Sequence, residues 1–284
     1  MESIAIARSS GSTMTSSAIA PSLVVSDLCH AFDAPDGSRT LIFDRLNFTV
    51  TRGGIVAIVG RSGAGKSTLF NLISGLLAPQ SGNISLAPRA DGTAGRIAYM
   101  LQKDLLLPWR TVLQNAVLGI ELHRAVTRED LDRAREMLAR YGLVGMADAY
   151  PHALSGGMRQ RVALTRTLLV DPTLVLLDEP FSALDYETRL MLEDDVMALR
   201  ENSGTSVVLV THDIEEAIAM SDSVIVLGGR PARVEQDILI ELTLPGPRDA
   251  ITAREAPEFR NYHAQIWGAL RSPAPDGAPH ARRQ

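Results

Sequence analysis

Short apolar runs alternate along this chain with longer stretches in which apolar residues recur at helical spacing. The continuously apolar runs are typical of strands that are buried on both faces of a sheet, and they lie at 55–59, 174–177, 207–210 and 224–227. The longer patterns predict helices at 66–73, 128–142 and 157–169. This alternation of strands and helices predicts an α/β sheet domain.

The two ends of the chain differ from this middle. Residues 1–21 are rich in Ser and Thr and predict a disordered leader, and residues 272–284 have the Pro, Gly and Ala content of a flexible tail. We expect one domain at 22–271, with a helical subdomain inserted at about residues 100–165. No stretch has the roughly 20 apolar residues that a membrane-spanning helix needs, so a membrane role would come through a partner.

Charge and cysteine content narrow the classes of function. The 284 residues include 28 Lys and Arg against 33 Asp and Glu, a net charge of −5. This balance provides no basic footprint for nucleic acid. A single cysteine, Cys29, excludes an internal disulfide and a cysteine-rich metal site and favours a reducing compartment.

A glycine-rich loop joins the first buried strand to the first helix. It matches the phosphate-binding pattern Gly-x4-Gly-Lys-Ser and reads Gly60, Arg61, Ser62, Gly63, Ala64, Gly65, Lys66, Ser67, Thr68. Backbone N–H groups and the helix dipole would surround the β- and γ-phosphates. Lys66 would add a positive charge and Ser67 a hydroxyl for Mg²⁺, so we expect a nucleoside triphosphate as ligand.

Two acids, Asp178 and Glu179, follow the buried run at 174–177. Open α/β sheets carry their chemistry at this end of their strands. Strand alternation would point the two side chains in opposite directions and give them different roles. We expect Asp178 in the Mg²⁺ shell and Glu179 as the general base for the attacking water.

The segment Leu154, Ser155, Gly156, Gly157 resembles the signature motif of the ATP-binding cassette (ABC) family. The resemblance implies a P-loop NTPase with a RecA-like sheet core, an antiparallel β subdomain and an inserted helical subdomain. It also implies that the signature binds the γ-phosphate held by a second cassette. Two chains, identical or different, would then enclose two ATP molecules, each with Mg²⁺.

Other family elements follow in the expected order. The resemblance implies that Gln102 is the Q-loop glutamine at Mg²⁺, Asp185 the D-loop residue that communicates across the dimer, and His212 the switch residue at the γ-phosphate. Phe32 stands where the family usually has an aromatic ring that stacks on adenine, although a core position would also explain it.

Within the family, the chain resembles the ATPase subunits of nitrate, sulfonate and taurine importers, through strings such as 107–112 and the signature form at 154–161. This implies permease subunits, an extracytoplasmic solute-binding protein reached through them, and a peripheral position on the cytoplasmic face of the inner membrane. Pro108 and Trp109 would border the groove for the permease. The solute itself stays open, because the permease and its binding protein select it.

Three alternatives predict different features. A soluble ABC ATPase acting on ribosomes or DNA predicts tandem cassettes or a long coiled-coil insertion, together with a basic surface. A catalytically dead subunit predicts the loss of Lys66, Glu179 or His212, and all three are present. An ABC exporter subunit resembles this chain less than importers do, but a cassette carries no solute pocket that decides between them.

Overall fold

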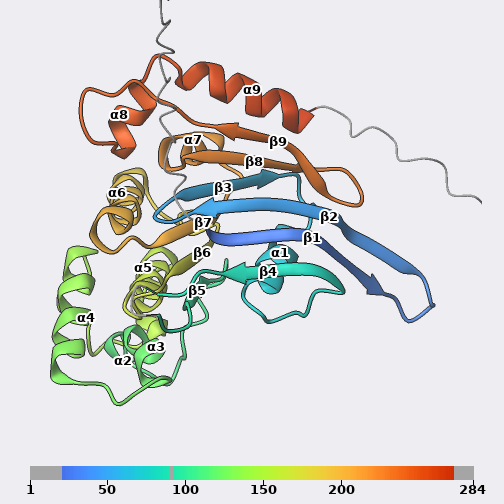
Figure 1. Cartoon of the computed structure of the whole chain (residues 1–284). Helices are drawn as coiled ribbons and strands as arrows, with labels where there is room; N and C mark the ends of the chain where they lie inside the picture. Colours follow the sequence, from blue (N-terminus) through green and yellow to red (C-terminus); the bar gives the residue numbers. More distant parts are fainter. Residues whose placement is uncertain (1–20, 90–91, 272–284) are drawn as a thin grey trace, which may run out of the picture.

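The computed structural model describes residues 21–89 and 92–271, so the leader and the tail expected from the sequence lie outside the described residues, apart from Pro21. Two sheets and their flanking helices make up the described chain (Figure 1). The smaller sheet is antiparallel, with strand order β2-β1-β4. Its strands are β1 (Pro21–Asp33), β2 (Arg39–Thr51) and β4 (Ser81–Leu86). This sheet is the antiparallel subdomain that the family resemblance implies.

The larger sheet has six strands in the order β5-β6-β7-β3-β8-β9. The strands are β3 (Ile55–Gly60), β5 (Ile97–Met100), β6 (Leu174–Asp178), β7 (Ser206–Val210), β8 (Ser223–Gly228) and β9 (Arg233–Leu239). All neighbours pair in parallel except β8 and β9, which are antiparallel. The four predicted strands are confirmed. The largely exposed β9 was not predicted, because its apolar positions form no continuous run.

A group of helices lies between β5 and β6 in the sequence, where the inserted subdomain was expected. It comprises α2 (Val112–Ala116), α3 (Leu118–Glu121), α4 (Arg128–Arg140), the 3-10 turn η1 (Pro151–Ala153) and α5 (Gly156–Leu168). Capping boxes begin two of these helices. The side chains of Thr111 and Thr127 accept hydrogen bonds from backbone N–H groups of α2 and α4, which fixes where the helices start.

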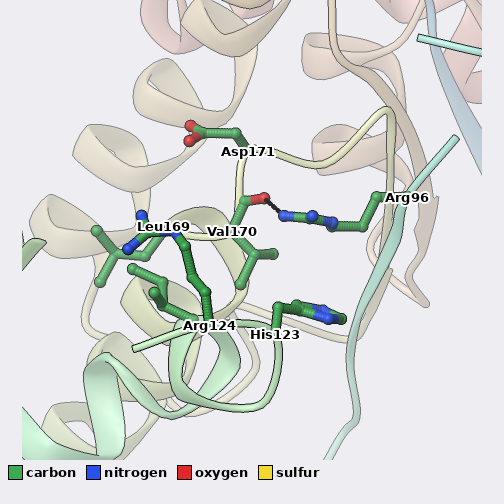
Figure 2. A pocket seen from close by; sticks show the side chains of 7 residues that line it. Arg96, His123, Arg124, Leu169, Val170 and Asp171 are labelled. Carbon is green, nitrogen blue, oxygen red and sulfur yellow. Dashed lines mark hydrogen bonds between the residues drawn. The ribbon is translucent and has the colours of Figure 1, made fainter. Parts of the chain in front are cut away.

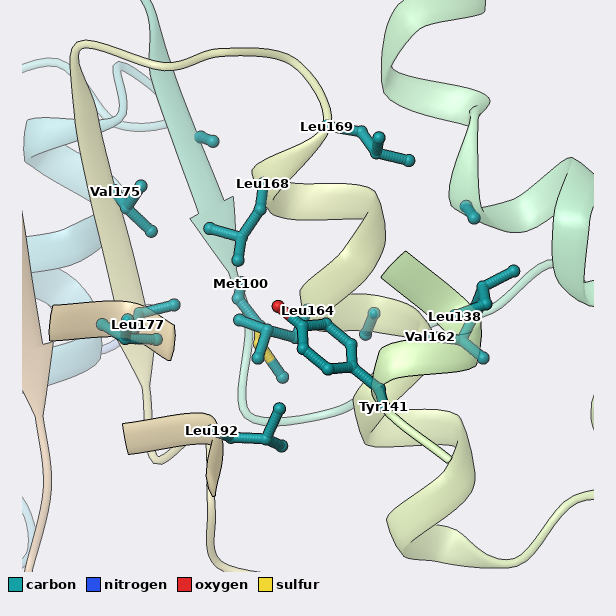
Figure 3. Packing of buried hydrophobic residues seen from close by; sticks show 14 of the residues in the cluster. Met100, Leu138, Tyr141, Val162, Leu164, Leu168, Leu169, Val175, Leu177 and Leu192 are labelled. Atoms are coloured by element: carbon teal, nitrogen blue, oxygen red, sulfur yellow. The ribbon is translucent and has the colours of Figure 1, made fainter. Parts of the chain in front are cut away.

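The helical subdomain and the large sheet share one apolar core. Figure 3 shows Tyr141 and Val162 of the helical subdomain close to Met100 and Leu177 of the sheet. The apolar cluster spans both parts, so packing contributes to the position of α5 relative to the strand ends.

The remaining helices surround the large sheet. They are α1 (Lys66–Ile73), α6 (Tyr186–Ser203), α7 (Ile214–Met220), α8 (Ala250–Glu255) and α9 (Phe259–Arg271). Helix α1 has the bounds predicted from the sequence. In Figure 1, α8 and α9 lie on the same side of the sheet as α7. No helix within 21–89 and 92–271 combines the length and the apolar character needed to cross a membrane.

Candidate nucleotide site

A pocket of about 560 Å³ lies at the carboxyl ends of β3, β6 and β7. Most of the catalytic and phosphate-binding residues expected from the sequence meet there, although β6 and β7 begin more than a hundred positions after β3. The lining residues are Ile42, Gly60, Ser62, Gly63, Gly65, Lys66, Ser67, Thr68, Gln102, Asp178, Glu179 and His212. The pocket therefore joins the glycine-rich loop to the acid pair and to two polar residues from other loops.

The conformation of the glycine-rich loop requires glycine at position 65. Gly65 has a φ of 85°, a conformation that L side chains rarely adopt. A Cβ at Gly65 would also lie 2.8 Å from Ile42 Cγ2 and 2.9 Å from Phe43 Cζ. Strand β2 of the small sheet thus presses on the loop directly, so both backbone angle and space require glycine.

Lys66 lies over the loop. Its Nζ donates hydrogen bonds to the Gly60 carbonyl at 2.8 Å and to the Arg61 carbonyl at 3.3 Å. Burial lowers the pKa of Lys66, and the negative charges of Glu179 and Asp178 oppose that effect. The ammonium group is therefore held by neutral carbonyls, which an anionic ligand would replace with stronger partners.

Asp178 ends β6 and is 5% exposed. Its Oδ2 accepts a hydrogen bond from Ser67 Oγ at 3.2 Å, and burial raises the pKa of Asp178 above its ordinary value. A buried carboxylate beside a hydroxyl, with Gln102 on the same pocket, is a set of hard oxygen donors that fits Mg²⁺. A bound cation would offset the cost of burying the Asp178 charge.

Glu179 lies just beyond the end of β6. Its φ is 50°, in the left-handed region, so the strand alternation that would separate its side chain from that of Asp178 does not extend to it. Both acids border the same pocket. Glu179 Oε2 accepts a hydrogen bond from Gln102 Nε2 at 2.9 Å and lies 3.5 Å from His212 Nδ1. One carboxylate oxygen of Glu179 is thus oriented by two side chains from separate loops.

The sequence interpretation missed Gln160, in the middle of α5. Its Nε2 donates to the Glu179 carbonyl at 3.2 Å, and its Oε1 accepts from the Ala183 N–H at 3.3 Å. The signature helix is therefore tied to the backbone of both Glu179 and the segment before Asp185. The available signal was a glutamine on the apolar side of an amphipathic helix, where it is 5% exposed.

Tyr99 was also missed as a neighbour of the acid pair. Its hydroxyl is hydrogen-bonded to Asp178, and burial together with the Asp178 charge raises the pKa of Tyr99. The ring packs edge to face on Phe70 of α1, with centroids 5.6 Å apart. Tyr99 alternates with buried residues along β5, a position that predicts packing rather than a polar contact.

The signature residues lie away from this pocket. Ser155 caps α5 by accepting a hydrogen bond from the Met158 N–H at 3.2 Å, and both Ser155 and Gly156 are exposed. Leu154 is buried beneath them. A Cβ at Gly157 would lie 3.1 Å from the Ala183 carbonyl oxygen, so the helix packs closely on the loop before Asp185. The start of α5 thus presents its backbone outward.

Four other predicted residues are not among those that line the pocket. Arg61 and Ala64 belong to the glycine-rich loop, and Asp185 caps α6 by accepting from the Thr188 N–H at 3.0 Å. Phe32 is 45% exposed and packs edge to face on His30, with centroids 5.0 Å apart. The exposed ring is accessible for stacking, while Ile42 of the neighbouring strand borders the pocket itself.

A smaller pocket of about 130 Å³ lies between the helical subdomain, the segment that follows α5 and Arg96, which directly precedes β5 (Figure 2). Its arginines already have protein partners. Arg96 Nη1 donates to the Val170 carbonyl at 2.7 Å, and Arg124 pairs with Asp130 through two bonds of 2.6 and 2.7 Å. This basic pocket is therefore an internal junction and adds nothing to the nucleotide site.

Comparison with known proteins agrees with this geometry. The model of the family described as "ABC transporter" matches residues 43–182. The chain is 36% identical to a nitrate import ATP-binding protein of Synechocystis, covering 88% of this chain and 95% of the relative. It is 37% identical to a taurine import ATP-binding protein of Rhizobium johnstonii, covering 85% and 93%.

A solved structure shows the same fold. It is the dimeric ATP-binding cassette MJ0796 in a post-hydrolysis state with ADP and Pi, which superposes with a TM-score of 0.68 at 29% identity. The alignment covers 99% of that cassette and 77% of this chain. The present chain therefore carries residues beyond the minimal cassette.

Proposed function

The chain belongs to the ABC transporter family as an ATP-binding protein, and we propose that it is the ATP-hydrolysing subunit of a membrane importer for a small solute. The observation that carries this proposal is the pocket in which the glycine-rich loop, Asp178, Glu179, Gln102 and His212 meet. The named nitrate and taurine importers among the relatives support the transport role.

The P-loop would hold the triphosphate of ATP. Backbone N–H groups and the N-terminus of α1 would face the phosphates, and Lys66, now bonded to the Gly60 and Arg61 carbonyls, would turn to bind phosphate oxygens. Ser67, Asp178 and Gln102 would hold Mg²⁺. The bound ion would neutralise charge on the β- and γ-phosphate oxygens. Phe32 would stack on the adenine ring.

Glu179 would act as the general base. It would accept a proton from the attacking water, and its contacts to Gln102 and His212 would hold the carboxylate in place beside the pocket. His212, exposed at the end of β7, would contact the γ-phosphate. Asp185 and the signature would carry the state of one site to the other.

Two cassettes would complete each site. Ser155, Gly156 and Gly157 are on the chain's surface and away from its own pocket, a position that suits contact with the ATP of a partner cassette. Each γ-phosphate would gain these contacts only when the dimer is closed, which shifts the equilibrium toward closure. Hydrolysis would remove that bridge.

The permease would dock near the start of the helical subdomain. Trp109 is 71% exposed and Pro108 is exposed, and both follow Gln102 by a few residues. An exposed tryptophan suits a protein interface. Docking there would place the chain on the cytoplasmic face of the inner membrane, with the solute chosen by the permease and its binding protein.

Mild detergent extraction of the tagged chain from native membranes tests the transport role. We expect a multi-span permease to be recovered with it, and ATP hydrolysis that Glu179→Gln abolishes. Recovery with ribosomes, or hydrolysis without any membrane partner, would contradict the importer role while leaving the ATPase role in place.

A further inference from the structure

The C-terminal segment, residues 248–271, packs on helix α7 through both of its helices, α8 and α9. Ile214, Ala217 and Ile218 of α7 share an apolar cluster with Phe259 and Ile266 of α9. Strand β3, which leads into the P-loop, contributes to the same cluster. Helix α7 is therefore enclosed between the central sheet and the C-terminal segment.

Arg248, which precedes α8, binds the carboxyl end of α7. Its Nε donates to the Ala219 carbonyl at 2.8 Å and its Nη2 to the Ile218 carbonyl at 2.7 Å. These carbonyls belong to the last turn of α7, where a cation is favoured by the helix dipole. Arg248 also lies 3.9 Å from Asp222, whose Oδ2 accepts from the Ile55 N–H of β3 at 2.9 Å. One guanidinium thus connects α7 to the strand that carries the P-loop.

Arg254 of α8 acts on the neighbouring helix. It pairs with Glu193 of α6 through bonds of 2.8 and 3.0 Å, and Glu193 is fully buried. Burial lowers the pKa of Arg254, but the hydrogen bonds and charge of Glu193 outweigh it and raise the pKa. Helix α6 in turn holds the amino end of α7, because Arg189 Nη1 donates to Asp213 Oδ2 at 3.2 Å. Glu216 of α7 is buried as well. We call Glu193, Asp213, Glu216, Arg248 and Arg254 the α7 junction.

His212 immediately precedes Asp213, the residue that caps α7. Helix α7 has seven residues, so its ends are about 10 Å apart. A short, close-packed helix behaves as a rigid body. If the contacts at its carboxyl end are lost, the shift of the helix also displaces His212 at its amino end.

We propose that Arg248 is a positioning residue for hydrolysis, which keeps α7 in the place that directs His212 toward Glu179 and the phosphate pocket. Arg254 supports it by fixing α6. This proposal rests on the proposed ATPase function and deepens it. The C-terminal segment touches no pocket residue in these contacts, yet it sets the position of His212.

The test compares Arg248→Ala and Arg248→Lys in the full chain with Arg260→Ala, an exposed arginine of α9. We expect Arg248→Ala to lower kcat between tenfold and a hundredfold while KM for ATP changes less than about twofold, because His212 shifts and the phosphate loop does not. Arg248→Lys keeps the positive charge but has a single nitrogen in place of the two that donate to α7. Its kcat should therefore lie between those of wild type and Arg248→Ala. Arg260→Ala should match wild type.

The imidazole signals of His212, assigned by NMR through their loss in His212→Ala, provide a second readout that needs no turnover. Arg248→Ala should move these signals, and Arg260→Ala should not. A lowered kcat with unmoved His212 signals, or equal losses in kcat and ATP affinity, would overturn the proposal. If Arg248→Ala does not fold, Arg248→Lys carries both readouts. Wild-type protein without ATPase activity would contradict the proposed function, and the NMR comparison would still decide the role of Arg248.

Discussion

The phosphate pocket and the α7 junction both bury acidic side chains, and they balance the charge in different ways. In the pocket, Asp178 is hydrogen-bonded to the hydroxyl groups of Ser67 and Tyr99. The nearby ammonium group of Lys66 donates to loop carbonyls and not to Asp178.

In the junction, both terminal nitrogens of the Arg254 guanidinium, Nη1 and Nη2, donate to the Glu193 carboxylate. The first region leaves its electrostatic balance to a ligand. In the second, the chain supplies the cation for Glu193, and burial raises the pKa of Glu216 to about 8. Of Asp178 and Glu193, the acid without a bonded cation is the one that borders the pocket.

The largest expected effect is on the pocket. Glu179→Gln removes the base while the phosphate loop stays intact, so we expect a loss of turnover of about 10³-fold with ATP binding retained. Phosphate release and equilibrium nucleotide binding measure the two properties. Glu129→Gln, on an exposed position of α4, is the matched control. Turnover at the wild-type rate in Glu179→Gln would exclude it as the base.

A second change tests whether the pocket is completed from outside. Ser155→Arg should abolish turnover by blocking the partner's phosphate, with a loss on the order of 10²-fold or more, while nucleotide binding at the mutant's own P-loop stays close to normal. Mixed dimers of Ser155→Arg and Lys66→Ala chains sharpen the test, since one of their two composite sites then carries both lesions and the other carries neither. Ordinary kinetics from a strict monomer would contradict the composite site.

Substitution of Glu193 in the α7 junction should lower the free energy of unfolding. Glu193→Ala leaves the Arg254 charge buried without its partner, so we expect a loss of about 3–5 kcal/mol in the free energy of unfolding. Urea unfolding measures it, with Glu187→Ala on the exposed start of α6 as control. Replacing Arg254 by Met in the same chain should recover part of the loss. A loss below about 1 kcal/mol would show that the pair contributes little.

The smallest effect is a pH dependence. Burial raises the pKa of Glu216 to about 8, and the charges of Glu193 and Asp213 add to the shift. The folded chain therefore holds a proton that the unfolded chain releases near its ordinary pKa, and stability from this group falls as pH rises toward 8. Glu216→Gln should gain roughly 2–3 kcal/mol over wild type between pH 6 and pH 8.

Unfolding of both proteins at several pH values measures this difference, and Glu215→Gln, on the exposed side of α7, is the control. A constant difference between Glu216→Gln and wild type across this pH range would mean that Glu216 does not titrate there.

The sequence predicted those parts of the site whose chemistry lies within a few consecutive residues. The loop at 60–68 and the acids after β6 have fixed spacings, because the backbone itself forms the phosphate cradle. The six-strand order and the edge strand β9 depend on pairing between distant segments, which local patterns do not specify. The resemblance to a family supplied His212 and Gln102 by their order along the chain.

The same reasoning explains what the sequence did not reveal. Arg254 and Glu193 are 61 positions apart, and neither stands in a motif. Gln160 reads as one polar residue on an apolar helix face, and only the packing of α5 against the loop at 179–183 gives it two backbone partners. Contacts of this kind depend on the tertiary arrangement, so secondary-structure propensity and hydrophobic periodicity do not predict them.

Two of the constraints on Gly65 do not depend on the nucleotide. The crowding by Ile42 and Phe43 and the positive φ exist without any nucleotide. A descendant cassette that had lost ATP binding would still be selected to keep this glycine, because replacing it would strain the contact between the two sheets. Lys66, whose hydrogen bonds are confined to loop carbonyls, has no comparable packing role and would drift first. In a survey of degenerate cassettes, the lysine therefore reports on activity, and the glycine before it reports on the fold.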